Sequence, residues 1–143
     1  MKLPLQIESQ SPEETGALGA RLAEMLEEGD FVALEGNMAA GKTHFIQGLA
    51  SGMGFVGHVT SPTFALMHIY EGGRMPLYHF DLYRIESPKE LEDLGYEEFF
   101  YSLGVCAVEW GSLAQGYLPK RRIEVRLEVV DERKRRITIA EIG

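Results

Sequence analysis

The sequence has one cysteine, no long hydrophobic run and little positive charge outside its last quarter. Cys106 is alone, so no disulfide forms within the chain, which suits a reducing compartment. No apolar stretch approaches the roughly 18 to 20 residues that a membrane-spanning helix needs. The first residues, MKLPLQIESQSPEE, lack the apolar core and cleavage site of a signal peptide. These absences predict a cytoplasmic protein without membrane contact.

Positive charge is scarce and concentrated near the C-terminus. The net charge is −8, whereas a dedicated nucleic-acid-binding domain is strongly basic. Eight of the fourteen lysine and arginine residues lie at or after position 120: Lys120, Arg121, Arg122, Arg126, Arg133, Lys134, Arg135 and Arg136. Charge runs usually form solvated faces, here of a two-stranded ribbon. The other interpretation is a basic patch that faces an anionic nucleotide or a partner.

The length of 143 residues and the apolar content of 45% predict one domain, residues 1–143, with its own core. Hydrophobic periodicity and capping signals predict helices at 11–28 and 42–52, one beginning at 87 and one near 96–101. Strands are predicted at 3–8, 31–35, 61–70, 74–83, 104–109, 123–130 and 135–142. This order predicts an α/β fold with parallel core strands in a mixed sheet, flanking helices and a C-terminal antiparallel hairpin.

A phosphate-binding pattern lies between the first apolar strand and the second helix. Residues 36–43, GNMAAGKT, fit G-x-x-x-x-G-K-[ST]. Main-chain N–H groups of such a loop, together with the positive end of the following helix, favour a polyphosphate. Gly36 and Gly41 allow backbone angles and close approaches that a side chain would block. The fold is therefore predicted to be P-loop NTPase-like.

The loop residues predict a triphosphate site. Lys42 is expected to reach the β- and γ-phosphates, and the Thr43 hydroxyl to be one ligand of Mg²⁺. The residues predicted to contact the nucleotide from this segment are Gly36, Asn37, Met38, Ala39, Ala40, Gly41, Lys42, Thr43 and His44. The guanine-reading motif Asn/Thr-Lys-x-Asp is absent, so ATP is the default nucleotide.

Two acidic residues compete for the second metal role that hydrolysis requires. Asp81 and Glu109 each end a strand-like run, and acids at the carboxyl ends of strands beside a phosphate loop can reach the ion. Each is otherwise a surface carboxylate. Trp110 is a core or lid residue by default, and the stretch 60–63 is either a turn set by proline or a switch-like loop near the γ-phosphate.

These motifs, in this order, resemble the TsaE (YjeE) family of bacterial P-loop ATPases in the tRNA threonylcarbamoyladenosine pathway. The blocks that carry the resemblance span residues 36–119. They are GNMAAGKT at 36–43, SPTF at 61–64, YHFDLYR at 78–84, SPKELE at 87–92 followed by LG at 94–95, EW at 109–110 and LP at 118–119.

The resemblance implies a Mg²⁺-dependent ATPase that acts with the TsaD and TsaB proteins. Together they add threonylcarbamoyl to adenosine 37 of tRNAs that read codons beginning with A, so tRNA is contacted through the complex. Hydrolysis is expected to be slow without partners. The resemblance also implies that Thr43 and Glu109 hold Mg²⁺, that Asp81 lies beside the metal or the attacking water, and that Trp110 lies near the nucleotide. Lys42, Asp81 and Glu109 are then the catalytic set.

The loop departs from the usual family pattern, Gly-Asp-Leu-Gly-Ala-Gly-Lys-Thr. Asn37 stands in place of aspartate, Met38 in place of leucine and Ala39 in place of glycine. Asn37 removes a negative charge close to the bound phosphates. These changes bear on loop geometry and hydrolysis rate more than on binding.

Two other functions fit a phosphate loop. A small-molecule kinase would use Arg84 or a C-terminal arginine to clamp the transferred phosphoryl group, and would phosphorylate an added acceptor. A nucleotide-dependent adaptor would bind ATP without turnover, and its binding to a partner would change with the nucleotide.

Overall fold

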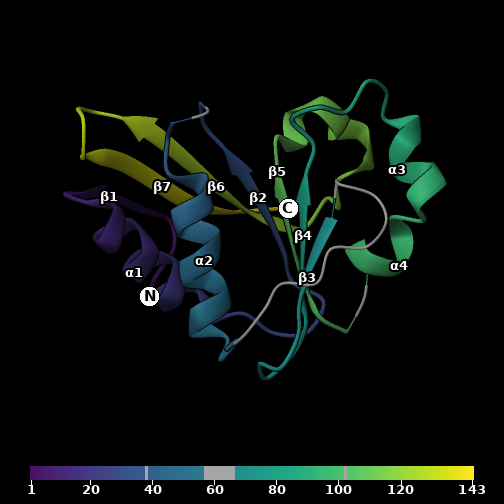
Figure 1. Cartoon of the computed structure of the whole chain (residues 1–143), viewed down its shortest axis with the longest axis horizontal. Helices are drawn as coiled ribbons and strands as arrows, with labels where there is room; N and C mark the ends of the chain where they lie inside the picture. Colours follow the sequence, from purple (N-terminus) through teal and green to yellow (C-terminus); the bar gives the residue numbers. More distant parts are fainter. Residues whose placement is uncertain (38, 57–66, 102) are drawn as a thin grey trace.

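A mixed sheet organises the computed structural model, which describes residues 1–37, 39–56, 67–101 and 103–143. Seven strands of this part of the chain lie in the order β1 (Leu5–Ser9), β7 (Arg135–Ile142), β6 (Arg122–Val129), β2 (Phe31–Glu35), β5 (Val105–Glu109), β4 (Leu77–Asp81) and β3 (Met67–Tyr70). The four strands from β6 to β4 are parallel, and β1, β7 and β3 are antiparallel to their neighbours. The predicted parallel centre and C-terminal hairpin are confirmed (Figure 1).

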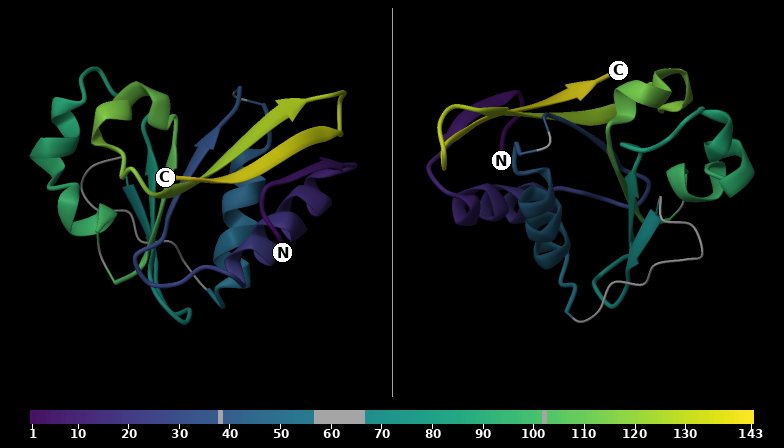
Figure 2. Two further views of the ribbon diagram at one scale, coloured as in Figure 1. Left: turned by 180° about the vertical axis from the view of Figure 1, so that it is seen from behind. Right: turned by 45° about the horizontal axis from the view of Figure 1, so that its top comes forward.

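Helices cover both faces of the sheet. α1 (Pro12–Ala23) and α2 (Lys42–Gly52) lie against one face. On the other side lie α3 (Lys89–Leu94), α4 (Glu97–Phe100) and the 3₁₀ helix η1 (Gly111–Tyr117), as the views in Figures 1 and 2 agree. η1 was not predicted from the sequence, because its stretch GSLAQGY carries no clear helical period.

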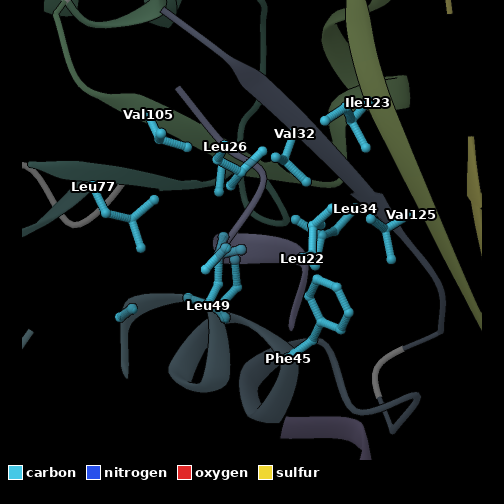
Figure 3. Close-up of a cluster of buried hydrophobic side chains, with 14 of the residues drawn as sticks. Leu22, Leu26, Val32, Leu34, Phe45, Leu49, Leu77, Val105, Ile123 and Val125 are labelled. Atoms are coloured by element: carbon cyan, nitrogen blue, oxygen red, sulfur yellow. The ribbon is translucent and has the colours of Figure 1, made fainter. Parts of the chain in front are cut away.

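Side chains of the central strands contribute to two separate cores, one on each face of the sheet. In β2, Val32 and Leu34 point to the core under α1 and α2, whereas Phe31 and Ala33 point to the other core. Side chains alternate between the two faces of a strand, so a strand covered on both faces reads as a continuous apolar run. Figure 3 shows Leu34, Phe45 and other side chains of the first core converging from the sheet and the two helices.

The first helix begins as predicted but ends early. The Ser11 hydroxyl accepts a hydrogen bond from the main-chain N–H of Glu14 at 3.1 Å, as an N-cap residue does. α1 ends at Ala23, not at Glu28, because the chain tightens into a turn held by the guanidinium of Arg74. That group donates to the carbonyls of Ala23 and Leu26. Leu26 still reaches the core from the turn.

Two strands are also shorter than predicted. β1 begins at Leu5, after Pro4, and β4 begins at Leu77, after Pro76. Proline has no N–H to donate to a sheet, so it marks the start of each strand. The predicted strand 61–70 is observed only over Met67–Tyr70, because positions 61–66 lie outside the described residues. No helix of the described part is both long and apolar enough to cross a membrane.

Candidate nucleotide site

The phosphate loop connects the carboxyl end of β2 to the start of α2. Gly41 has φ +96°, a conformation that side chains other than glycine rarely adopt. At Gly36 a Cβ would lie 2.6 Å from the carbonyl oxygen of Leu127, so the close approach of β6 requires glycine there. Asn37 and Ala39 are exposed and Ala40 is buried, while Met38 lies outside the described residues. Both glycines therefore have the structural roles that the motif predicts.

Lys42 is held at the centre of this loop. Its residue is only 3% exposed, and its ammonium group donates a hydrogen bond to the Gly36 carbonyl at 2.5 Å. The same Nζ lies 3.5 Å from the centroid of the Trp110 ring, a cation–π contact. Burial lowers the pKa of the Lys42 ammonium, and the carboxylates of Glu109, Asp81 and Glu35 oppose that shift.

The two predicted acids lie side by side at the carboxyl ends of two neighbouring strands. Asp81 ends β4 and Glu109 ends β5, and these residues are register partners in the parallel pair. Glu109 is 5% exposed, and its Oε2 lies 2.6 Å from Nε2 of His79. Asp81 is partly exposed and accepts a hydrogen bond from the main-chain N–H of Tyr83 at 3.1 Å. Both carboxylates are close enough to act on the charge of Lys42.

Trp110 adopts an unusual backbone conformation next to these acids. Its φ is +63°, in the left-handed region, which costs a residue with a side chain about 1–2 kcal/mol. Its main-chain N–H donates to the carbonyl of Leu34 at 3.2 Å. The centroid of its ring lies 5.2 Å from that of the Tyr83 ring. The turn places the indole against the Lys42 ammonium, at the border of the core that contains Phe31 and Ala33.

A cavity of about 210 Å³ opens beside the loop, on the side of α1. Thr43 and His44 are exposed at the start of α2 and line it. The remaining lining residues are Pro12, Thr15, Ala39, Gly41, Lys42, Arg133 and Arg135. The cavity thus joins the phosphate loop to the start of α1 and to the turn of the β6–β7 hairpin.

Comparisons with known proteins show the family of the chain. Residues 9–137 match the model of the family described as threonylcarbamoyl adenosine biosynthesis protein TsaE. The chain belongs to the TsaE family.

Relatives and a solved structure support this membership over the whole chain. A Treponema pallidum protein named tRNA threonylcarbamoyladenosine biosynthesis protein TsaE is 42% identical over 132 residues, which are 92% of this chain and 97% of that protein. A Bacillus subtilis protein of the same name is 42% identical over 93% of this chain and 83% of its own length. The crystal structure of Bacillus subtilis YdiB superposes with a TM-score of 0.82 at 36% identity, covering 100% of this chain and 88% of that one. As a TsaE-family protein, the chain has a role in tRNA threonylcarbamoyladenosine biosynthesis.

The candidate site also contains residues that the sequence analysis did not single out. Glu35 ends β2, and its carboxylate accepts hydrogen bonds from the N–H of Ser112 at 2.8 Å and from its hydroxyl at 3.3 Å. Arg135 donates to the carbonyl of Ala39 at 2.9 Å, so the hairpin turn is tied to the phosphate loop. The C-terminal charge run was the available signal for Arg135. Glu35 ends an apolar strand, as Asp81 and Glu109 do, so that pattern was its available signal, whereas no sequence pattern marks Thr15.

Other predicted residues fall elsewhere. Arg84 is exposed just beyond β4. The hydroxyl-rich stretch 60–63 and His58 lie outside the described residues. The basic residues near the C-terminus have two kinds of position. Arg133 and Arg135 line the cavity, whereas Arg126 and Arg136 are exposed on the strands, as residues of a solvated face are.

Proposed function

We propose that this TsaE-family chain, residues 1–143, is a Mg²⁺-dependent ATPase that acts with TsaD and TsaB in threonylcarbamoylation of adenosine 37 of tRNAs reading codons that begin with A. The observation that carries the proposal is the juxtaposition of Lys42 with Asp81 and Glu109 at the mouth of a phosphate loop. Phosphoryl transfer from ATP to water needs this combination of a loop cation and metal-supporting acids. With a net charge of −8, the chain is proposed to meet tRNA through its partners.

The loop itself is proposed to bind the phosphates. Main-chain N–H groups of such a loop and the N-terminus of α2 supply donors and a favourable dipole. Lys42 is already desolvated, so its charge acts on a phosphate more strongly than it would in water. A bound phosphate oxygen replaces the Gly36 carbonyl as the acceptor for Nζ.

The oxygen donors at the site suit Mg²⁺. Thr43 offers a hydroxyl, and Glu109 and Asp81 offer carboxylates, which are the hard ligands that this ion prefers. Among the described residues no group of three or more His, Cys, Asp or Glu side chains could hold a metal alone. Mg²⁺ commonly binds through one or two carboxylates plus substrate phosphates, as such a site requires. When bound, the ion neutralises charge that develops on the phosphate oxygens.

Glu109 and Asp81 are proposed to have different roles. Glu109, buried beside the loop, is the protein's carboxylate for the ion together with the Thr43 hydroxyl. Asp81 is more exposed, and its main-chain hydrogen bond from Tyr83 fixes its orientation. It therefore orients the attacking water or supports the ion through a water.

Catalysis by the isolated chain is proposed to be slow. Nη1 of Arg135 donates to the carbonyls of Asp131 and Lys134, and Nη2 donates to Ala39, so this guanidinium is engaged with the main chain. Arg84 is exposed beyond β4. A cation that stabilises the transition state is then a contribution expected from TsaD or TsaB.

The nucleoside end of ATP is proposed to enter the cavity between α1 and the hairpin turn. Arg135→Ala removes the hydrogen bond to Ala39 and one wall of this cavity, so we expect ATP affinity to fall about tenfold, in line with the roughly 1.5 kcal/mol of a hydrogen bond from a charged group. Arg136→Ala is the matched control, because Arg136 is the next residue of β7 and is exposed. Calorimetric titration with ATP measures both. Equal affinities of the two variants would contradict this assignment.

The Glu109→Gln variant tests the ATPase directly. Phosphate release with TsaD and TsaB present is expected to require Mg²⁺, to stop with EDTA, and to fall about 100-fold or more in Glu109→Gln, because the charge facing the ion is lost. Binding of ADP without Mg²⁺ should stay within a few-fold of the unaltered protein. Glu128→Gln, an exposed change on β6, is the control. Turnover that is indifferent to EDTA, or unaltered in Glu109→Gln, would overturn the proposal.

A further inference from the structure

A buried histidine contacts the carboxylate proposed to face the ion. His79 lies on β4, two residues before Asp81, and is 8% exposed. Its Nε2 lies 2.6 Å from Oε2 of Glu109, whose residue is 5% exposed. The pair is therefore largely buried, and water screens it only weakly.

Simple chemistry assigns the donor in this pair. An ionised carboxylate can only accept hydrogen bonds, so Nε2 of His79 carries the proton that lies between the two groups. One lone pair of Oε2 of Glu109 is thereby engaged, so Oε1 is the oxygen with both lone pairs left for an ion. A buried carboxylate without such a donor would be costly, so the pair is strongly favoured over a freely rotating carboxylate.

The imidazole is itself held in place from the next strand. β3 pairs with β4 so that His68 is the register partner of His79. The ring of His79 lies 5.8 Å from that of His68 and 6.3 Å from that of Tyr70, centroid to centroid. Nδ1 of His79 is buried and has no hydrogen-bond partner among the described residues, so Nε2 provides the ring's hydrogen bond within this part of the chain.

We infer that His79 is a positioning residue that fixes the Glu109 carboxylate for Mg²⁺. The inference rests on the proposed function and deepens it. Partners of metal-binding carboxylates orient the ligand, and their removal typically costs 10- to 100-fold in metal affinity or activity. Without His79, Glu109 is free to turn toward the Lys42 ammonium, which already feels its charge.

Two substitutions separate this role from packing. His79→Leu removes the donor, whereas His79→Gln places an amide N–H close to the position of Nε2. Leu77→Ala is the matched control, because Leu77 is 1% exposed, lies on the same strand and face, and belongs to the core under α1 and α2. All three variants alter a buried side chain of β4, but only His79→Leu lacks a donor for Glu109.

ADP affinity is measured by calorimetric titration at increasing Mg²⁺ concentrations, and ADP excludes turnover. The quantity compared is the Mg²⁺ concentration at which half of the metal-dependent gain in ADP affinity is reached. For His79→Leu we expect this concentration to rise about 10- to 100-fold, with ADP affinity in EDTA unaltered. His79→Gln and Leu77→Ala should stay within about threefold of the unaltered protein. Binding of Mn²⁺ to the ADP complex, followed by electron paramagnetic resonance, gives a second readout.

The outcomes are separable. An unaltered Mg²⁺ requirement in His79→Leu, or an equal shift in Leu77→Ala, would overturn the role of His79 and leave the proposed ATPase intact. If His79→Leu does not fold, His79→Asn takes its place, because its shorter amide does not reach Glu109; equal Mg²⁺ requirements of His79→Asn and His79→Gln would then refute the inference. Unaltered protein whose ADP affinity ignores Mg²⁺ would refute the proposed function together with this inference.

Discussion

Lys42→Ala is expected to abolish measurable ATP binding at micromolar protein concentrations while the fold persists. The ammonium group is the cation at the centre of the phosphate loop, and it is already stripped of water. A hydrogen bond to a charged group contributes about 1.5–3 kcal/mol, and a desolvated charge facing a triphosphate makes more than one such contact. We therefore expect affinity to fall at least about 100-fold, or roughly 2.7 kcal/mol.

A second substitution distinguishes charge from shape. Lys42→Met keeps an unbranched side chain against the Trp110 ring but removes the charge. It should lose ATP binding as completely as Lys42→Ala and should have a melting temperature closer to that of the unaltered protein. Lys89→Ala, at the exposed start of α3, is the control for removal of a lysine. Fluorescent-nucleotide binding and thermal unfolding provide the two measurements, and normal ATP affinity in Lys42→Met would exclude this site.

The parts of the site that the sequence predicted are those with local signals. The loop GNMAAGKT is one continuous stretch, and its glycines meet demands of turn geometry and close approach that are visible at Gly36 and Gly41. Asp81 and Glu109 could be predicted because each ends an apolar strand. The core strands were predicted for the same reason, since burial on both faces leaves an unbroken apolar run.

The contacts of the site that the sequence did not predict depend on which strands and turns become neighbours in the fold. Glu35 reaches Ser112, and Arg135 reaches Ala39, across long separations in the chain. A charge at a strand end or in a turn has no preferred partner until the sheet order is known. His79 is a further case, because its contact with Glu109 follows from the parallel pairing of β4 with β5 and not from any spacing.

The predictions were less accurate where a tertiary contact overrode the local preference of the sequence. The sequence favours helix to Glu28, yet α1 ends at Ala23, where Arg74 from the β3–β4 connection binds the last carbonyls. Trp110 was predicted as a core or lid residue; it packs at the border of the core that contains Phe31, and the left-handed turn also brings its ring against the Lys42 ammonium. Such strain tends to gather at functional sites, where the surroundings determine the conformation.

The contact between α1 and α2 supports the whole site and is made by glycines. α2 carries Lys42 and Thr43, and the start of α1 lines the cavity beside them. A Cβ on Gly48 would lie 2.6 Å from the carbonyl carbon of Gly16 and 2.8 Å from its Cα. A Cβ on Gly52 would lie 2.6 Å from the carbonyl oxygen of Ala20. Main chain therefore packs against main chain, and no side chain can give way.

Gly48→Ala is accordingly expected to destabilise the protein, even though alanine favours helix over glycine by about 1 kcal/mol. Overpacking typically costs about 1–3 kcal/mol, and here it must separate two helices, so the cost lies at the upper end and we expect a net loss of about 2 kcal/mol. For a chain of this length the melting temperature should fall by about 5–10 °C. Thermal unfolding followed by circular dichroism measures this fall.

The matched control is Gly116→Ala in η1, where an added Cβ meets no atom within 4 Å. That variant should stay within about 0.5 kcal/mol of the unaltered protein. Because separated helices also displace the phosphate loop from the hairpin turn, Gly48→Ala should weaken ATP binding at a temperature where it is still folded. A melting temperature at or above that of Gly116→Ala would show that α1 and α2 do not pack through their main chains.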